Sequence, residues 1–178
     1  MTNSLFSRQA QLAIVQGGLD MIEATQKSAF RRQKFLVHCD KEVFSSISKN
    51  YPKAVSLDKA LNESSTFNAF LLDASQQLSL EYLLLEMSHC IKLLKEGGNG
   101  CIIIPTYDEL TLLPLEFASQ VQGFLLRNNC VMITAQEDRS KRLLTLLVQY
   151  NGYARFTINK IYTKEERATL FVPTTQLP

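Results

Sequence analysis

Two glycines and two aspartates stand where a nucleotide-like ligand could bind. Gly17-Gly18 follows the short apolar run Leu12–Val15 and precedes Leu19–Arg32, which has helical spacing. Glycines between a strand and a helix let the backbone approach a ligand, and the helix N-terminus offers unpaired amides. Asp40 comes about 20 residues after the glycines, the usual distance of a carboxylate that binds a ribose. Asp73 ends another apolar run and is expected at the same edge of a sheet, where ligands bind in folds of this kind.

The glycines and Asp40 also have a purely structural explanation. A glycine pair is an ordinary turn between a strand and a helix, and Asp40 is placed to cap a helix over Lys41–Phe44. The dipeptides His38-Cys39 and His89-Cys90 do not indicate zinc, because adjacent residues point to opposite faces of a strand or lie about 100° apart on a helix. We therefore expect no metal site, and Cys39 is expected to be an inert core thiol.

Two apolar runs and an amphipathic segment between them predict a βαβ unit. From about Leu78 to Lys95, apolar residues recur at steps of three and four, which places them on one helix face, and Gly97-Gly98 would end that helix. Phe67–Asp73 and Cys101–Pro105 have the length and composition of strands that are covered on both faces. Strand, helix and strand in this order form a parallel pair with a right-handed crossover.

The same alternation predicts an α/β fold for the whole chain. The expected architecture is a three-layer, Rossmann-like, mostly parallel sheet with a C-terminal antiparallel hairpin, in a single domain over residues 1–178 with flexible ends at 1–8 and 174–178. The further strands are expected at Leu12–Val15, Phe35–Cys39, Ala54–Leu57 and Cys130–Ile133, and in a hairpin of Arg155–Tyr162 and Ala168–Val172. The further helices are expected at Leu19–Arg32, Glu42–Asn50 and Glu109–Arg127, and from Thr134 through Tyr150.

The order of these parts resembles the class I S-adenosylmethionine-dependent methyltransferases. Between Lys34 and Ile104 the chain has a strand ending in an acid (FLVHCD), a helix ending at a proline (EVFSSISKNYP) and a short strand (AVSL). A second strand with a terminal acid (FNAFLLDA), a long helix and the passage LLKEGGNGCIII follow. The resemblance implies S-adenosylmethionine as the cofactor and a methyl transfer that depends mainly on in-line positioning.

The family's site residues transfer to five positions of this chain. The family has an acid in its first strand and three spaced glycines in the loop that follows, whereas LAIV has no acid and Gln16 and Asp20 stand where glycines are expected. The segment DASQ also differs from the motif of members that methylate amino groups of bases. The resemblance implies a cofactor loop of Gln16, Gly17 and Gly18, a ribose contact from Asp40, and Asp73 beside the transfer site.

Two functions are compatible with this pattern. The first is a methyltransferase that transfers a methyl group from S-adenosylmethionine to a small molecule or a protein. The second is a non-catalytic methyltransferase-like scaffold or interaction subunit that binds a protein partner, or a second copy of itself, through an apolar helix face. The stretch Glu109–Phe124 has more apolar residues than one core-facing stripe needs. The residues expected to face a partner are Leu110, Leu113, Phe117, Val121 and Phe124.

Composition argues against several other functions. The 178 residues include 19 Lys and Arg against 17 Asp and Glu, a net charge of +2, which provides no basic excess for nucleic acid or a membrane surface. No apolar run approaches the roughly 20 residues of a membrane span, and no GxxxxGK(S/T) phosphate loop occurs. Four cysteines without regular spacing indicate reduced thiols, so we expect a cytoplasmic protein.

Overall fold

A computed structural model describes residues 6–27, 29–63 and 65–151 of the chain. Its strands are β1 (Phe35–His38), β2 (Ala54–Ser56), β3 (Phe67–Asp73), β4 (Leu94–Pro105), β5 (Tyr107–Asp108), β6 (Leu113–Pro114), β7 (Cys130–Asp138) and β8 (Leu143–Tyr150). Its helices are α1 (Arg8–Gln26), α2 (Ala29–Arg32), α3 (Lys41–Ser48), α4 (Leu57–Leu61), α5 (Leu80–Lys92) and α6 (Phe117–Arg127).

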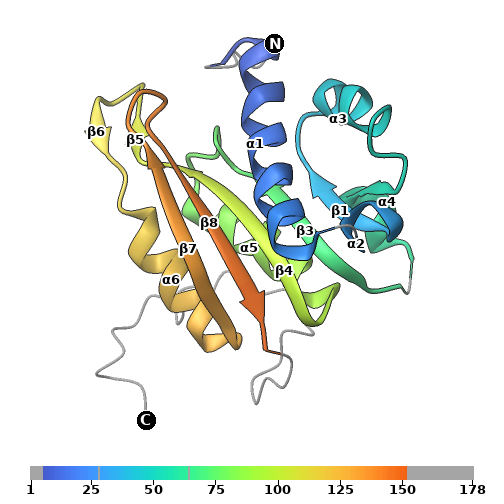
Figure 1. Cartoon of the computed structure of the whole chain (residues 1–178). Coiled ribbons are helices and arrows are strands. Elements are labelled where there is room, and N and C mark those ends of the chain that lie inside the picture. Colours follow the sequence, from blue (N-terminus) through green and yellow to red (C-terminus); the bar gives the residue numbers. More distant parts are fainter. Residues whose placement is uncertain (1–5, 28, 64, 152–178) are drawn as a thin grey trace.

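The main sheet has six strands in the order β2-β1-β3-β4-β8-β7, and β5 pairs with β6 apart from it (Figure 1). The four strands from β2 to β4 are parallel, whereas β8 runs antiparallel to both β4 and β7. The predicted class is therefore confirmed: the fold is α/β with a mostly parallel sheet. None of the described helices is both long and apolar enough to cross a lipid bilayer.

Two apolar cores cover the two faces of the sheet. Successive residues of a strand point to opposite faces, so Phe35 and Val37 of β1 pack with α1 and α3, while Leu36 packs with α4, α5 and α6. Figure 1 shows α1 crossing one face of the sheet, with α5 behind the strands. These three layers explain why the parallel strands are continuous apolar runs in the sequence.

The central βαβ unit confirms the prediction with one change. β3 has the predicted bounds, and α5 lies within the predicted helix, with the Ser79 hydroxyl accepting a hydrogen bond from the Tyr82 amide at its start. The two glycines do not end that helix. β4 already begins at Leu94, and Gly97, with φ +80°, lies where the register of β4 against β3 shifts. Glycine has the conformation that such a bulge requires.

The predicted strand Leu12–Val15 and the loop after it are wrong. Residues 8–26 form one continuous helix, which begins at the N-cap Ser7, whose hydroxyl accepts a hydrogen bond from the Ala10 amide. The apolar run belongs to a longer series, because Val15, Leu19 and Ile22 recur at steps of four and three and are all fully buried. The glycines are therefore interior residues of α1.

The predicted helix from Thr134 through Tyr150 is also wrong, because this segment forms the antiparallel pair β7–β8. Its two strands are joined by a turn in which the Asp138 carboxylate accepts hydrogen bonds from the Ser140 hydroxyl (2.7 Å) and the Lys141 amide (3.1 Å). Leu147 of β8 packs against the α1 side and Leu146 against the α6 side. The hairpin predicted at Arg155–Tyr162 and Ala168–Val172 lies outside the described residues.

Candidate functional site

The strand order reverses between β1 and β3. The chain passes outward from β1 to β2 and then returns to the other side of β1 with β3, from which β4 continues in the opposite direction. His38 at the end of β1 is in register with Leu72, so the carboxyl ends of the two strands lie side by side. Ligands of open α/β sheets bind at such a switch point, outside the carboxyl ends of the strands.

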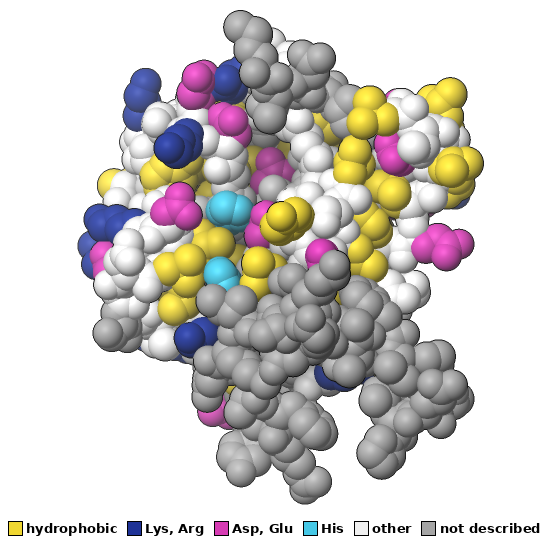
Figure 2. Space-filling view, turned by 180° about the vertical axis from the view of Figure 1, so that it is seen from behind, with side chains coloured by type: hydrophobic (Ala, Val, Ile, Leu, Met, Phe, Trp, Pro, Cys, Tyr) yellow, Lys and Arg dark blue, Asp and Glu magenta, His cyan; other side chains and the backbone are white. Residues whose placement is uncertain are grey.

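A group of polar side chains lies at this switch point. The His38 imidazole is 3.8 Å from the Glu86 carboxylate of α5, to which Gln77 also donates a hydrogen bond. Asp73, at the end of β3, accepts a hydrogen bond from the Ser75 amide. Burial raises the pKa of the Asp73 carboxyl, while the amide and hydroxyl of Ser75 partly offset that rise. Figure 2 shows this face, with histidine and acidic side chains beside a hollow and apolar ones around them.

A cavity of about 280 Å³ opens next to this group, at the carboxyl ends of β1 and β2. The apolar part of its lining comes from Val37, Phe44 and Leu57, and Asp58, in the first turn of α4, contributes a carboxylate. Its volume is close to the lower limit of roughly 300 Å³ for typical ligand pockets. Cys39 also lines the cavity, and its burial, with smaller effects of Asp73 and Asp40, raises the pKa of its thiol to about 12.

Asp40 is the N-cap of α3. Its carboxylate accepts hydrogen bonds from the amides of Glu42 (2.9 Å) and Val43 (3.4 Å), and the Arg8 guanidinium is 3.8 Å away. These amides would otherwise be the donors that a helix N-terminus offers to an anionic ligand. The structural interpretation of Asp40 therefore accounts for its contacts. Asp40 and Asp73 are brought to the same edge of the sheet, as predicted, and the charge of Asp40 contributes to the raised pKa of Asp73.

The other predicted site residues do not reach this edge. Gln16 donates hydrogen bonds to the Asp20 carboxylate and the Tyr51 hydroxyl, both at 2.9 Å. Gly18 packs against the middle of the sheet, because a Cβ atom placed there would be 2.5 Å from a methyl carbon of Leu71. The predicted cofactor loop of Gln16, Gly17 and Gly18 is thus replaced by one face of α1. The turn that follows the switch-point strand β1 contains no glycine.

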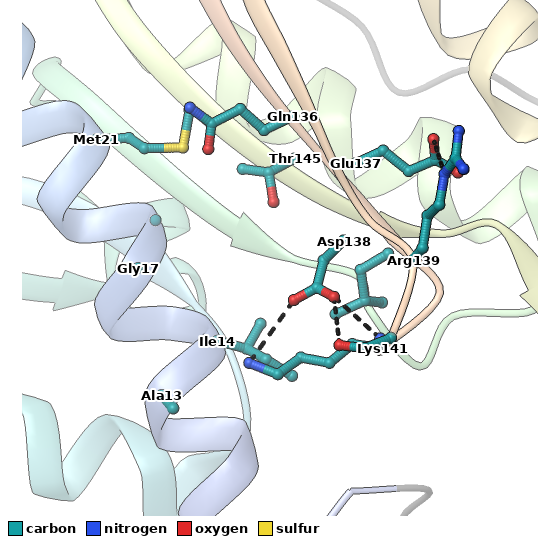
Figure 3. A pocket seen from close by; sticks show the side chains of 13 residues that line it. Ala13, Ile14, Gly17, Met21, Gln136, Glu137, Asp138, Arg139, Lys141 and Thr145 are labelled. Atoms are coloured by element: carbon teal, nitrogen blue, oxygen red, sulfur yellow. Dashed lines mark hydrogen bonds and ion pairs between the residues drawn. The ribbon is translucent and has the colours of Figure 1, made fainter.

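Gly17 instead borders a cavity of about 590 Å³, which separates α1 from the β7–β8 turn. Figure 3 shows Asp138 and Lys141 extending into this gap towards α1, while Glu137 and Arg139 lie on the far side of the turn. The Asp138 carboxylate and the Lys141 ammonium form an ion pair at 3.9 Å. The charges on this side of the gap are therefore paired with each other.

The predicted partner surface is only partly exposed. Residues 109–116 are not helical, and α6 begins at Phe117. Phe117, Val121 and Phe124 are buried in this chain's own core, so they are wrongly assigned to a partner surface. Leu110 and Leu113, at the β5–β6 hairpin, are 78% and 62% exposed.

Several residues at the site were missed in the sequence. Asp58 lies two residues after the end of β2, and an acid just after a short apolar strand is a signal that could have identified it. Lys141 and Arg142 belong to a basic cluster that is visible in the sequence, but its proximity to Tyr107 of β5 could not be predicted, because these segments meet only in the folded chain. Among the described residues, no three His, Cys, Asp or Glu side chains form a group that could hold a metal ion.

Comparisons with known proteins add a likeness in structure alone. No known protein family matches the sequence, and no curated protein matches it. An O-methyltransferase family protein from Burkholderia thailandensis superimposes with a TM-score of 0.50 at 12% identity, over 82% of this chain and 58% of that one. The 16S rRNA methylase ArmA superimposes with a TM-score of 0.51 at 9% identity, over 84% of this chain and 88% of that one.

The chain has a class I methyltransferase-like fold. The pyocyanin biosynthetic protein PhzM also matches, with a TM-score of 0.47 at 14% identity, over 75% of this chain and 55% of that one. The chain thus spans little more than half the length of two of these proteins. At these identities the likeness describes the arrangement of helices and strands. Activity, cofactor and substrate must be argued from the residues of this chain.

Proposed function

We propose that this protein binds S-adenosylmethionine at the carboxyl ends of β1 and β2 and transfers its methyl group to a small molecule or a protein. The observation that carries the proposal is the cavity of about 280 Å³ beside the switch point, in a methyltransferase-like fold. Asp58 borders this cavity, and Asp73 lies at the end of β3. A ligand placed between these two carboxylates would extend from β2 across β1 towards β3.

The lining of the cavity fits the nucleoside part of this cofactor. Val37, Phe44 and Leu57 provide apolar contacts for a flat base, and the Asp58 carboxylate can accept hydrogen bonds from ribose hydroxyls. The methionine part would lie against the turn after β1, where the side chains of Cys39 and Asp40 take the place of glycines. The proposal therefore assigns most of the binding free energy to the nucleoside.

Residues of this chain have three roles in the proposed reaction. When bound, the cofactor supplies a methyl group on a sulfonium sulfur, which an acceptor attacks in line. Asp58 and the apolar wall bind and orient the nucleoside, and Phe44 excludes water from it. Asp73 and His38 are the groups near the switch point that can accept a proton from the acceptor, and burial favours the protonated form of Asp73.

Calorimetric titration with S-adenosylmethionine tests the binding step. We expect saturable binding by the wild-type protein and about tenfold weaker binding by Asp58→Asn, since a hydrogen bond to a charged group contributes roughly 1.5–3 kcal/mol. Asp20→Asn is the matched control: it makes the same change on α1, at the position that the sequence placed in the cofactor loop. Absence of heat at millimolar cofactor, or equal weakening by both variants, would contradict the proposal.

Asp40 provides a second control, because its structural role and its predicted ribose contact have different consequences. Asp40→Ala should lower the free energy of unfolding by about 1 kcal/mol, whereas Asp40→Asn should retain the cap, since asparagine is an equally good N-cap. Both variants should bind S-adenosylmethionine as the wild type does. The measurements are urea denaturation and the same calorimetric titration. Weaker cofactor binding by Asp40→Asn, at unchanged stability, would indicate that Asp40 contacts the ribose.

A second candidate is the non-catalytic scaffold. It is favoured by the turn after β1, which lacks a glycine, and by the use of the α3 amides to bind Asp40. The exposed side chains of Leu110, Leu112 and Leu113 at the β5–β6 hairpin would be its contact surface. This candidate requires an assembly in light-scattering measurements after gel filtration and no cofactor binding. Methyl transfer by the purified protein would exclude it.

A further inference from the structure

A third cavity, of about 320 Å³, lies at the carboxyl ends of β3 and β4, near the switch point. The residues after β3 and β4 form one side of it, and the β7–β8 turn forms another. Its described lining consists of Phe6, Ser75, Pro105, Tyr107, Glu109, Ser140, Lys141, Arg142 and Leu143.

Ser75 supplies a buried hydroxyl that is poorly satisfied within the chain. The residue is 3% exposed, and its hydroxyl makes no hydrogen bond of normal geometry with any described residue, although it lies near Asp73. A buried hydroxyl without a partner costs roughly 1–3 kcal/mol. Ser75 lines the cavity, so a ligand there could satisfy this hydroxyl.

Arg142 supplies a positive charge that is held in place. Its guanidinium donates a hydrogen bond to the Glu109 carboxylate (3.0 Å) and stacks on the Tyr107 ring at 4.3 Å from the ring centroid. A guanidinium has five N–H donors, so one bond to Glu109 leaves others for a ligand. Lys141 also lines the cavity, but its ammonium is paired with the Asp138 carboxylate at 3.9 Å. The guanidinium donors of Arg142 that Glu109 leaves free are therefore the groups that could bind a carboxylate.

The rest of the lining is apolar and includes an aromatic ring. Phe6, Pro105 and Leu143 contribute apolar surface, and Tyr107 contributes a ring beside the guanidinium. A ligand that matches all three parts has a small, flat apolar body, a carboxylate and a hydroxyl group. The carboxylate would bind Arg142, and the hydroxyl would bind Ser75.

We propose that this cavity binds a small aromatic hydroxy acid. That the acid is also the methyl acceptor rests on the function proposed above, because Ser75 lies two residues from Asp73 at the expected transfer site. Binding itself does not depend on that function. The two proposals can therefore fail separately.

The test is a binding titration of the full chain in the absence of cofactor. Binding is measured by NMR or calorimetry. The probes are 4-hydroxybenzoate and its neutral analogue 4-hydroxybenzamide, which differ in charge and little in shape. The wild-type protein should bind the acid at least about tenfold more tightly than the amide, because a charge-assisted hydrogen bond is roughly twice as strong as a neutral one. Equal binding of the two probes, or no binding of the acid at millimolar concentration, would overturn the proposal.

Variants identify the residues responsible. Arg142→Gln should remove most of the preference for the acid, and Arg142→Lys, which keeps the charge, should retain part of it. Arg139→Gln is the matched control, because Arg139 is in the same turn but has a 90% exposed side chain paired with Glu137. Ser75→Ala should weaken binding of the acid several-fold, because it removes the hydroxyl that the ligand would bind. An equal loss in Arg139→Gln and Arg142→Gln would contradict the assignment.

A separate titration with S-adenosylmethionine distinguishes the two proposals. If the acid binds as expected and the cofactor does not, the cavity assignment stands and the methyl transfer fails. If the cofactor binds and the acid does not, the cavity assignment fails and the cofactor site stands.

Discussion

At the scale of single residues, neighbours in the sequence have different roles because they face different surroundings. Gly17 and Gly18 are adjacent on α1, and consecutive residues of a helix point about 100° apart. A Cβ atom at Gly18 would meet Leu71 at 2.5 Å and Cys101 at 3.2 Å, so the absence of a side chain allows α1 to lie close to the sheet. A Cβ atom at Gly17 would have no neighbour within 4 Å.

We expect substitutions of the two glycines by alanine to have opposite effects on stability. Gly18→Ala should lower the free energy of unfolding by about 1–3 kcal/mol, because the added methyl group overpacks a buried contact. Gly17→Ala should raise it by about 0.5–1 kcal/mol, because alanine has the higher helix propensity and space is available. Urea denaturation of both variants measures the difference. A shift of the same sign in both would contradict the packing of α1 described above.

At the scale of elements, apolar residues that follow one another in the sequence lie partly in α6 and partly in the β5–β6 hairpin before it, with different burial. Phe124, within α6, is fully buried in the core that α6 shares with α5. Leu113, in β6, is 62% exposed. The sequence pattern placed both residues on one partner-facing helix, whereas the structure assigns the first to internal packing and leaves the second at the surface.

The stability of two truncation variants tests this separation. Phe124→Ala should lower the free energy of unfolding by about 3–5 kcal/mol, the usual cost of removing a buried phenylalanine. Leu113→Ala should change it by no more than about 0.5 kcal/mol, as is typical of surface positions. Chemical denaturation followed by circular dichroism provides both values. A large loss in Leu113→Ala would indicate that the hairpin is packed in an assembly.

At the scale of the whole molecule, the cysteines report on the integrity of the core. None of the four forms a disulfide bond. Burial raises the pKa of the thiols of Cys39, Cys101 and Cys130 to about 12, and it also raises the pKa of the Cys90 thiol. A thiolate is the reactive form, so these thiols should be inert in the folded protein. Because the thiol pKa values are raised in the folded state, the free energy of unfolding depends on pH in the alkaline range.

We expect stability to fall as the pH rises above 9, the ordinary pKa of a thiol in the unfolded chain. Between that pH and about 12 the unfolded state loses thiol protons that the folded state retains, so deprotonation favours unfolding. Melting temperatures measured across this range should decline less steeply for Cys101→Ala than for the wild type. Rapid reaction of the folded protein with a thiol reagent at pH 8 would contradict the burial of these groups.

The predictions from sequence succeeded where local pattern and final packing agree. β3 and α5 were located because their apolar residues have the period of the structure that they form. The carboxyl-end position of Asp40 and Asp73 followed from the βαβ order alone. The cofactor loop could not be located in this way, because LAIV before two glycines is compatible with either a strand and a turn or one helix.

By itself, the sequence determined the α/β class, the mostly parallel sheet and the edge at which its acids gather, because these depend on periodicity and on the order of elements. Only the tertiary structure decided that α1 is continuous, that residues 130–150 form two strands, and that Ser75 and Arg142 border one cavity. The physical reason is that the pattern of a short apolar run is compatible with either a helix or a strand. Burial against a particular neighbour, such as Leu71 against Gly18, selects between them.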